Sequence, residues 1–282
     1  DGALVGTQDL SVGVDGRWSM YPTALLFTDE DNETRAGWVN SIQIHNLALP
    51  DGYIAALGGA TANGIPLTTN GPAYEQYDFN GNLNSSVGGN PLTVGFAAPA
   101  VSAGVTYSNV TIAGGAAQAA AFTRGTFFSL VHGLEANGGG SGLNQYTLLF
   151  DVMFPSRPSG WAALYQNTTA NSDDAECFIN PSQGIGISGN YAGTVADGTW
   201  NRLAIVVDNV AGTFTTYVNG APAQQNTGLT LDGRWAIGPS LLFFADNDQE
   251  NAAGLVNSLQ LRPTAMLPAE VAHLPLPVVF PA

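Results

Sequence analysis

The stretch GTWNRLAIVVDNVAGTFTTYVNG, residues 198–220, decides the fold class of this chain. Apolar residues alternate in Leu203–Asp208 and Thr213–Val218, which predicts two half-buried strands. Asn219-Gly220 follows the second strand, and this dipeptide suits the type I′ turn that joins antiparallel strands. The 35 Gly and 16 Pro that punctuate short strands favour a sandwich. Further strands are expected at Tyr146–Phe154, Leu241–Phe244 and Leu255–Leu261, and a short helix at Pro268–Leu274.

Part of the sequence occurs twice. Asp15-Gly16-Arg17-Trp18 returns as Asp232-Gly233-Arg234-Trp235, and residues 15–57 match 232–274 at 19 of 43 positions. A long strand-rich segment precedes the second copy, whereas the first copy begins close to residue 1. The chain is therefore predicted to contain the C-terminal half of one module and one complete module. The predicted boundaries are 1–57 for the half-module, 58–73 for a linker, 74–274 for the complete module and 275–282 for a Pro-rich tail.

The half-module raises the question of what covers it. Residues 1–57 are too few to close a sandwich, so their strands would leave edges and an apolar face bare. A preceding segment, the complete module or a neighbouring chain could cover them. In the last case residues 1–57 would complete a neighbour's sheet and produce a homo-oligomer or a filament.

The composition excludes several classes of partner. The formal net charge is −15, all seven basic residues are Arg, and charged residues make up 10% of the chain, against about 25% in average proteins. Such a chain cannot build the cationic surface that nucleic acid requires. No apolar run approaches the roughly 20 residues of a membrane span. Neutral glycans and calcium remain compatible with this charge.

Three motifs in order resemble the concanavalin A-like, laminin-G-like and pentraxin-like jelly-roll family. They are the strand beginning Gly198-Thr-Trp-Asn, the hairpin Tyr217-Val-Asn-Gly220, and the closing strand Gly254–Leu261 with the helix after it. The resemblance covers roughly residues 75–274 well and 1–57 as a half-copy. It implies an all-β fold, with two antiparallel sheets forming a β-sandwich jelly roll. It also implies roles in carbohydrate binding, protein binding or cell adhesion, often with calcium at the rim.

An acidic pattern repeated in both copies is the best candidate for a metal site. Asp246, Asp248 and Glu250 alternate with other residues in a predicted loop, as do Asp29, Asp31 and Glu33 in the first copy. Carboxylates at such spacing can converge on one hard cation, with carbonyl and Asn oxygens completing the shell. The pattern predicts Ca²⁺. The alternative is an acidic, solvated loop.

Five further residues are weaker candidates for ligand binding. Asp173, Asp174 and Glu176 precede a predicted strand and could add metal ligands or face a glycan, although a polar turn is the favoured explanation. Trp161 and Tyr191 lie in loop-like contexts and could stack on sugar rings.

Catalytic motifs are missing from the sequence. Gly184-Ile-Gly186-Ile-Ser-Gly189 fits the dinucleotide-binding pattern, but no helix follows, so it is expected to be a Gly-rich strand. Cys177 is expected to be buried. The Ala-rich residues 98–121 are expected to form irregular strands or long loops. No zinc pattern, nucleophile elbow or glycosidase carboxylate pair is present.

These observations predict a non-catalytic, extracellular or cell-surface protein that binds a glycan or an extracellular protein through calcium-stabilised jelly rolls. One alternative is a structural subunit that assembles into filaments through residues 1–57. The other is an accessory carbohydrate-binding module of a larger secreted hydrolase.

Overall fold

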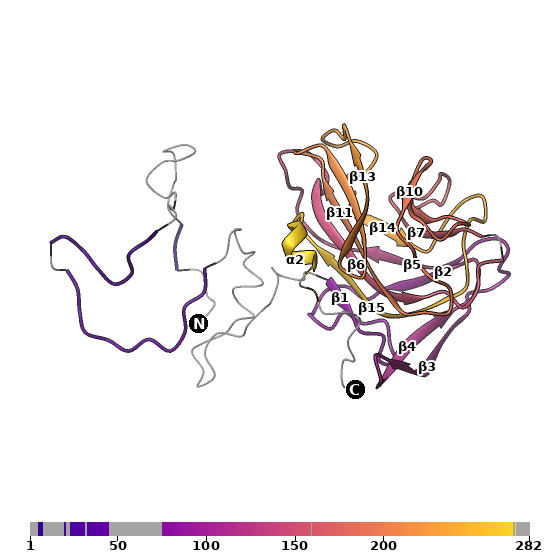
Figure 1. The fold of residues 1–282 in the computed structure, drawn as a ribbon, viewed down its shortest axis with the longest axis horizontal. Helices are drawn as coiled ribbons and strands as arrows, with labels where there is room; N and C mark the ends of the chain where they lie inside the picture. The colour runs from indigo at the N-terminus through magenta and orange to yellow at the C-terminus, as the bar shows by residue number, and fades with distance from the viewer. Residues whose placement is uncertain are drawn as a thin grey trace. The chain divides into compact units, whose positions relative to one another are not determined.

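The computed structural model describes residues 5–7, 20, 23–31, 33–44, 75–158, 160–272 and 274. The chain divides into two compact units, Asp1–Pro72 and Ala73–Ala282. Every described helix and strand belongs to the second unit, which Figure 1 shows as two facing layers of strands. Within the described residues, no helix is both long and apolar enough to cross a membrane.

In the first unit, the described residues lie outside helices and strands. Their large apolar side chains are exposed, including Leu25, Phe27 and Trp38. Residues 8–19 and 45–57 of the predicted half-module, the predicted linker 58–73 and the tail 275–282 lie outside the described residues. The half-module therefore stays a prediction.

The predicted strands of the second unit are confirmed. Leu203, Ile205 and Val207 enter the main core, whereas Ala204 and Val206, on the opposite face, join a second apolar cluster. The strand is therefore buried on both faces, and the prediction that it is only half-buried was wrong. Asn219 and Gly220 both have positive φ, at 52° and 83°, as the predicted turn requires.

The first sheet has eight antiparallel strands. Their order is β13 (Ala221–Thr227), β12 (Thr213–Val218), β11 (Asn201–Asp208), β6 (Gln145–Met153), β15 (Gly254–Arg262), β4 (Gly115–Phe122) and β3 (Val105–Ile112), and β1 (Glu75–Tyr77) also pairs with β15.

The second sheet has seven antiparallel strands. Their order is β10 (Asn190–Ala192), β9 (Ile185–Ile187), β8 (Cys177–Ile179), β7 (Ala162–Gln166), β14 (Ser240–Phe243), β5 (Thr126–Val131) and β2 (Thr93–Phe96). The two sheets form the predicted jelly-roll sandwich (Figure 1). As expected, Cys177 is buried and the Gly-rich motif forms the hairpin of β9 and β10.

The expectation of irregular strands or long loops at residues 98–121 was wrong. Residues 98–121 include the regular eight-residue strand β3 and most of β4, which pair along their whole length. Ala side chains gave a weak apolar pattern, but Ala119 and Ala120 are fully buried. The hydrogen-bonded pairing of β4 with β15 makes this segment a strand, and such tertiary context overrides weak β propensity.

The helix α2 (Pro268–Ala272) covers part of the outer face of the first sheet. Its Val271 clusters with Leu149, Val206 and Tyr217 of that sheet. The Leu267 N–H donates to Glu270 Oε2 at 2.6 Å, which caps the first turn. Leu274, the last residue of the predicted helix, lies outside it.

Phe244, directly after β14, joins the two sheets at the centre of the core. Its ring stacks on Phe122 at a centroid distance of 4.5 Å and meets Phe128, Phe150 and Phe154 at 5.9–6.4 Å. Phe122, Phe128 and Phe150 lie on β4, β5 and β6, and Phe154 directly follows β6. The ring therefore ties strands of both sheets together.

Replacing this ring tests its role. Phe244→Ala should lower the free energy of unfolding by about 3–5 kcal/mol, because it opens a cavity among four aromatic rings. Phe96→Ala is the matched control, since Phe96 is 51% exposed, and should change stability far less. Denaturant unfolding measures both. Equal losses in the two variants would contradict this account of the core.

Candidate functional site

The acidic loop of residues 244–253 joins β14 to β15 and is organised around Asp246. This carboxylate is 1% exposed. Its Oδ2 accepts hydrogen bonds from the N–H groups of Asp248 and Glu250 at 2.9 and 3.0 Å, and its Oδ1 accepts one from Ala175 at 3.3 Å. Asp246 therefore shapes its own loop and fastens it to the neighbouring loop of residues 167–176.

The first copy of the acidic pattern has the same local turn. The Asp31 N–H donates to Asp29 Oδ2 at 2.9 Å, as Asp248 does to Asp246. Phe27 and Phe244, at equivalent positions, have φ of 59° and 64°. The surroundings differ, because Asp29, Asp31 and Glu33 are exposed. The turn is thus a local property of the repeated sequence.

Four carboxylates influence one another at the rim between the two loops. Burial raises the pKa of Glu250, and the charges of Asp246, Asp174 and Asp248 raise it further. Burial also raises the pKa of Asp246, against the hydrogen bonds that it accepts. Asp173, Asp174 and Asp248 are exposed. The structure therefore brings together the acidic candidates of two separate sequence segments.

No preformed metal cage is present in this rim. Among the described residues, no group of three or more His, Cys, Asp and Glu side chains could hold a metal ion. Both carboxylate oxygens of Asp246 already accept hydrogen bonds from backbone N–H groups. The side-chain oxygens Asn171 Oδ1 and Asn251 Oδ1 are buried beside the acidic residues in sequence and accept no hydrogen bond. These two amide oxygens are additional potential ligands that the sequence pattern did not single out.

The two aromatic candidates, thirty residues apart, lie against each other. The rings of Trp161 and Tyr191 are 5.6 Å apart, and Trp161 also meets Phe178 at 5.9 Å. Trp161 and Tyr191 are each partly exposed. Burial raises the pKa of Tyr191 to about 12, and the charges of Cys177, Glu250 and Asp174 contribute to the rise. The aromatic pair therefore adjoins the acidic rim.

Glu176 differs from the other acidic candidates because it is buried. Its Oε2 accepts a hydrogen bond from the Asn167 N–H at 2.8 Å, and its Oε1 lies 4.0 Å from Arg234 Nε. Burial raises its pKa to about 7, although the Asn167 N–H and Arg234 act in the opposite direction. Such a pKa is typical of a general acid, but only 4% of Glu176 is exposed. Through its contacts with Asn167 and Arg234, the buried Glu176 stabilises the loop of residues 167–176.

The repeated Asp-Gly-Arg-Trp motif supports the same loop. Trp235 Nε1 donates to the Glu176 carbonyl at 3.4 Å, and Arg234 Nη2 donates to the Ala175 carbonyl at 3.2 Å. Asp232 accepts hydrogen bonds from the Asn144 side-chain amide and from the N–H groups of Ser141 and Gly142, and these lower its pKa. The first copy of the motif, which includes Trp18, lies outside the described residues.

Arg124 stabilises the backbone of the acidic loop, and no sequence pattern indicated this role. Its guanidinium donates to the carbonyls of Gln249 and Asn251 at 2.8 and 3.1 Å. The Ala163 N–H, at the start of β7, donates to the Glu250 carbonyl at 2.9 Å. The site therefore rests on a fixed backbone.

Comparison with known proteins agrees with this architecture. The Laminin_G_3 family profile, described as the concanavalin A-like lectin/glucanases superfamily, matches residues 132–272. Domain 4 of AbnA, an extracellular arabinanase from Geobacillus stearothermophilus solved with arabinotriose, superposes with a TM-score of 0.52 at 20% identity, covering 71% of this chain and 96% of that one. At this identity the similarity shows the fold alone.

A second solved structure is less similar. The binding domain of botulinum neurotoxin serotype D superposes with a TM-score of 0.48 at 10% identity, over 71% of this chain and 49% of that one. A search of curated protein sequences returns no match.

The buried Glu176 predicts a pH dependence of stability. Its pKa rises from 4.5 to about 7 on folding, so the native state holds the proton more tightly. Its contribution to stability is complete below pH 4.5 and is lost as the pH rises to 7, by roughly 3 kcal/mol. Glu176→Gln removes this loss and keeps an acceptor for Asn167.

The variant should match the wild-type free energy of unfolding at pH 4 and exceed it at pH 8. Urea unfolding across this range measures the difference, with Glu135→Gln, at an exposed position, as control. A difference that stays constant with pH would contradict the assignment.

Proposed function

Because the chain belongs to the concanavalin A-like lectin/glucanases superfamily, we propose that it is a non-catalytic, extracellular binding module for neutral glycans. The observation that carries this proposal is the partly exposed pair of Trp161 and Tyr191 beside an acidic rim. Aromatic rings pack on the apolar faces of sugars. Carboxylates and amide oxygens accept hydrogen bonds from sugar hydroxyl groups.

The charge around the pair favours neutral ligands. The charges of Glu250 and Asp174 act on Tyr191, whereas Arg234 and Arg124 donate hydrogen bonds to backbone carbonyls. An anionic sugar would meet like charges there, which disfavours binding.

The arrangement of the carboxylates supports a non-catalytic role. Glycoside hydrolysis requires two carboxyl groups that flank the scissile bond, one of them as a protonated acid. Glu176 has the raised pKa of such an acid but is buried under the loop. Asp246 binds three backbone N–H groups. Neither group is placed to reach a sugar.

Substitution of the pair tests glycan binding. Trp161→Ala and Tyr191→Ala should each weaken binding of a neutral oligosaccharide by roughly tenfold, because each removes a stacking surface. Isothermal titration calorimetry with glucan, xylan and arabinan oligosaccharides measures this. Arabinotriose belongs in the panel because the similar arabinanase domain was solved with it.

Trp38→Ala is the matched control, since Trp38 is fully exposed in the first unit, and it should bind as the wild type does. The proposal is wrong if no member of the panel binds, or if the double variant of Trp161 and Tyr191 keeps both the stoichiometry and the affinity of the wild type.

We also propose that Ca²⁺ stabilises the acidic rim. Asp248 and Glu250 would supply carboxylate ligands, and Asn171 Oδ1 and Asn251 Oδ1 are unpartnered oxygens of the type that Ca²⁺ prefers. The mutual repulsion that raises the pKa of Glu250 would fall when a cation binds. Asp29, Asp31 and Glu33 would supply the corresponding ligands in the first unit.

Removal of the metal tests this second proposal. With a Kd of about 0.1 mM, typical of extracellular sites, 1 mM Ca²⁺ should raise the melting temperature by roughly 3 °C relative to EDTA. The double variant Asp248→Asn, Glu250→Gln should lose most of this rise. Mg²⁺ at the same concentration is the control. Equal melting temperatures in Ca²⁺ and EDTA would refute calcium binding.

A further inference from the structure

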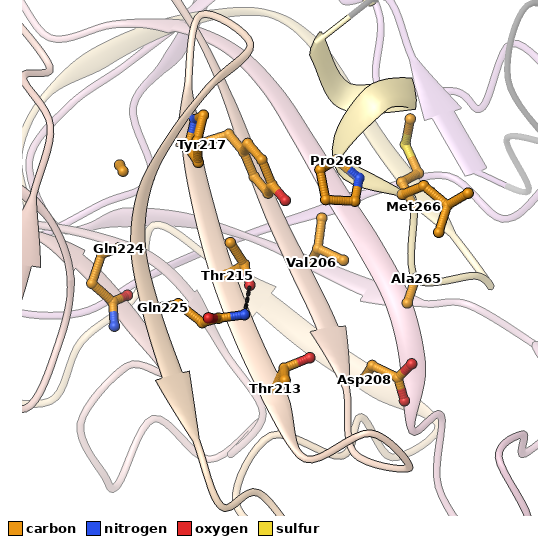
Figure 2. Close-up of a pocket in the computed structure, with 13 residues that line it drawn as sticks. Val206, Asp208, Thr213, Thr215, Tyr217, Gln224, Gln225, Ala265, Met266 and Pro268 are labelled. Atoms are coloured by element: carbon orange, nitrogen blue, oxygen red, sulfur yellow. Dashed lines mark hydrogen bonds between the residues drawn. The ribbon is translucent and has the colours of Figure 1, made fainter.

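A groove of about 450 Å³ lies on the outer face of the first sheet (Figure 2), and none of its lining residues comes from the β7–β8 or β14–β15 loop. Its floor comes from β11, β12 and β13, and the segment between β15 and α2 forms one wall. Small-molecule sites span about 300–1,000 Å³. The residues that line it are Val206, Asp208, Thr213, Thr215, Tyr217, Pro222, Ala223, Gln224, Gln225 and Ala265–Pro268.

The wall of the groove is held in place by hydrogen bonds. Thr147 Oγ1, on β6, donates to the Thr264 carbonyl at 2.8 Å and accepts from the Met266 N–H at 3.0 Å. The Leu267 N–H donates to Glu270 Oε2 in the cap of α2. The groove is therefore already formed without a ligand, which lowers the entropic cost of binding.

Tyr217 provides an unpartnered hydroxyl in this groove. Its side chain is 3% exposed, and Figure 2 shows the hydroxyl pointing towards Val206 and Pro268 across the groove. Its oxygen forms no hydrogen bond with any part of the chain that the structure describes, and it is not one of the fully buried polar atoms that lack a partner, so the hydroxyl reaches the open space of the groove. Burial raises the pKa of Tyr217, so the group stays a neutral donor and acceptor.

The remaining lining has one polar and one apolar side. Thr213, Thr215 and Gln225 present polar groups from β12 and β13, with Gln225 Nε2 donating to Thr215 Oγ1 at 3.3 Å. Ala265, Met266 and Pro268 present apolar surface opposite to them. Among the described lining residues none is basic, and Asp208 is acidic. A neutral ligand with hydroxyl groups on one side and C–H groups on the other matches this lining.

We propose that this groove is a second glycan-binding site, which takes one or two units of a neutral saccharide. A saccharide hydroxyl replaces solvent as the partner of the Tyr217 hydroxyl, and a C–H face of the sugar packs against Met266 and Pro268. The ligand class rests on the proposed function, whereas the groove shares no residue with the Trp161–Tyr191 pair. The module would then bind one polysaccharide chain, or two, through both of its sheets.

Methionine methyl groups offer a site-specific probe. The chain has three Met residues, and Met266 is the one that lines the groove, whereas Met153 ends β6. Protein labelled with ¹³C-methyl methionine is titrated with the same oligosaccharide panel, and Met266→Leu assigns the signal. At least one oligosaccharide should shift the Met266 signal and leave the Met153 signal in place.

Two variants sharpen the test. Tyr217→Phe removes only the hydroxyl and should weaken the affinity reported by Met266 by roughly tenfold, with an unchanged melting temperature because no hydrogen bond is lost. Ala265→Phe should fill the groove and abolish the shift. Tyr107→Phe, on β3, is the matched control and should leave the titration unchanged.

The two sites are tested separately by the double variant Trp161→Ala, Tyr191→Ala. It should keep the Met266 shift even if it loses binding at the aromatic pair. The inference is overturned if no oligosaccharide moves the Met266 signal, if Tyr217→Phe titrates like the wild type, or if the signal moves with protein concentration alone, which would indicate a second copy in the groove.

Discussion

The stacking of Phe244 on Phe122 is the contact on which the rest of the second unit depends. This contact lies in the core between the two sheets. Phe244 directly follows the last residue of β14 and has a positive φ. Asp246 follows two residues later and ties the loop of residues 244–253 to the loop of residues 167–176. The same ring therefore anchors the core and sets the position of the acidic rim.

The basic residues serve structure rather than ligand contact. Arg157 pairs with Asp197 at 2.7 Å, Arg202 pairs with Asp151 at 2.5 Å, and Arg124 and Arg234 bind backbone carbonyls. With so few cations and most of them engaged, the excess of acidic residues stays largely uncompensated. This excess of negative charge is the reason for proposing neutral ligands at both the aromatic pair and the groove beside α2.

The two proposed sites differ in how the fold builds them. The aromatic pair and the acidic rim are made by loops and short strands of the second sheet. Their backbone is fixed by hydrogen bonds that Arg124 donates and that the carboxylates of Glu176 and Asp246 accept. The groove uses the outer face of long strands, where α2 covers Val206 and Tyr217 only in part. A sandwich with one partly covered face can thus present two separate surfaces.

Short-range features were predictable because residues close in sequence create them. The alternation in Leu203–Asp208, the turn at Asn219-Gly220 and the shared turn of Asp29 and Asp246 depend on local hydrogen bonds and backbone preferences. The prediction failed for residues 98–121, where pairing with β15, over a hundred residues away, outweighs the weak pattern of small side chains.

Burial and convergence were decided only by the tertiary structure. Phe27 and Phe244 have the same φ, yet Phe27 is 73% exposed and Phe244 is 1% exposed. The sequence marked Trp161, Tyr191 and the acidic residues separately, but only the packing of β7, β9 and β10 brings the rings together. The tertiary packing also buries Glu176, and it leaves the Tyr217 hydroxyl without a hydrogen-bond partner among the described residues. These outcomes depend on neighbours far along the chain, which a local pattern cannot encode.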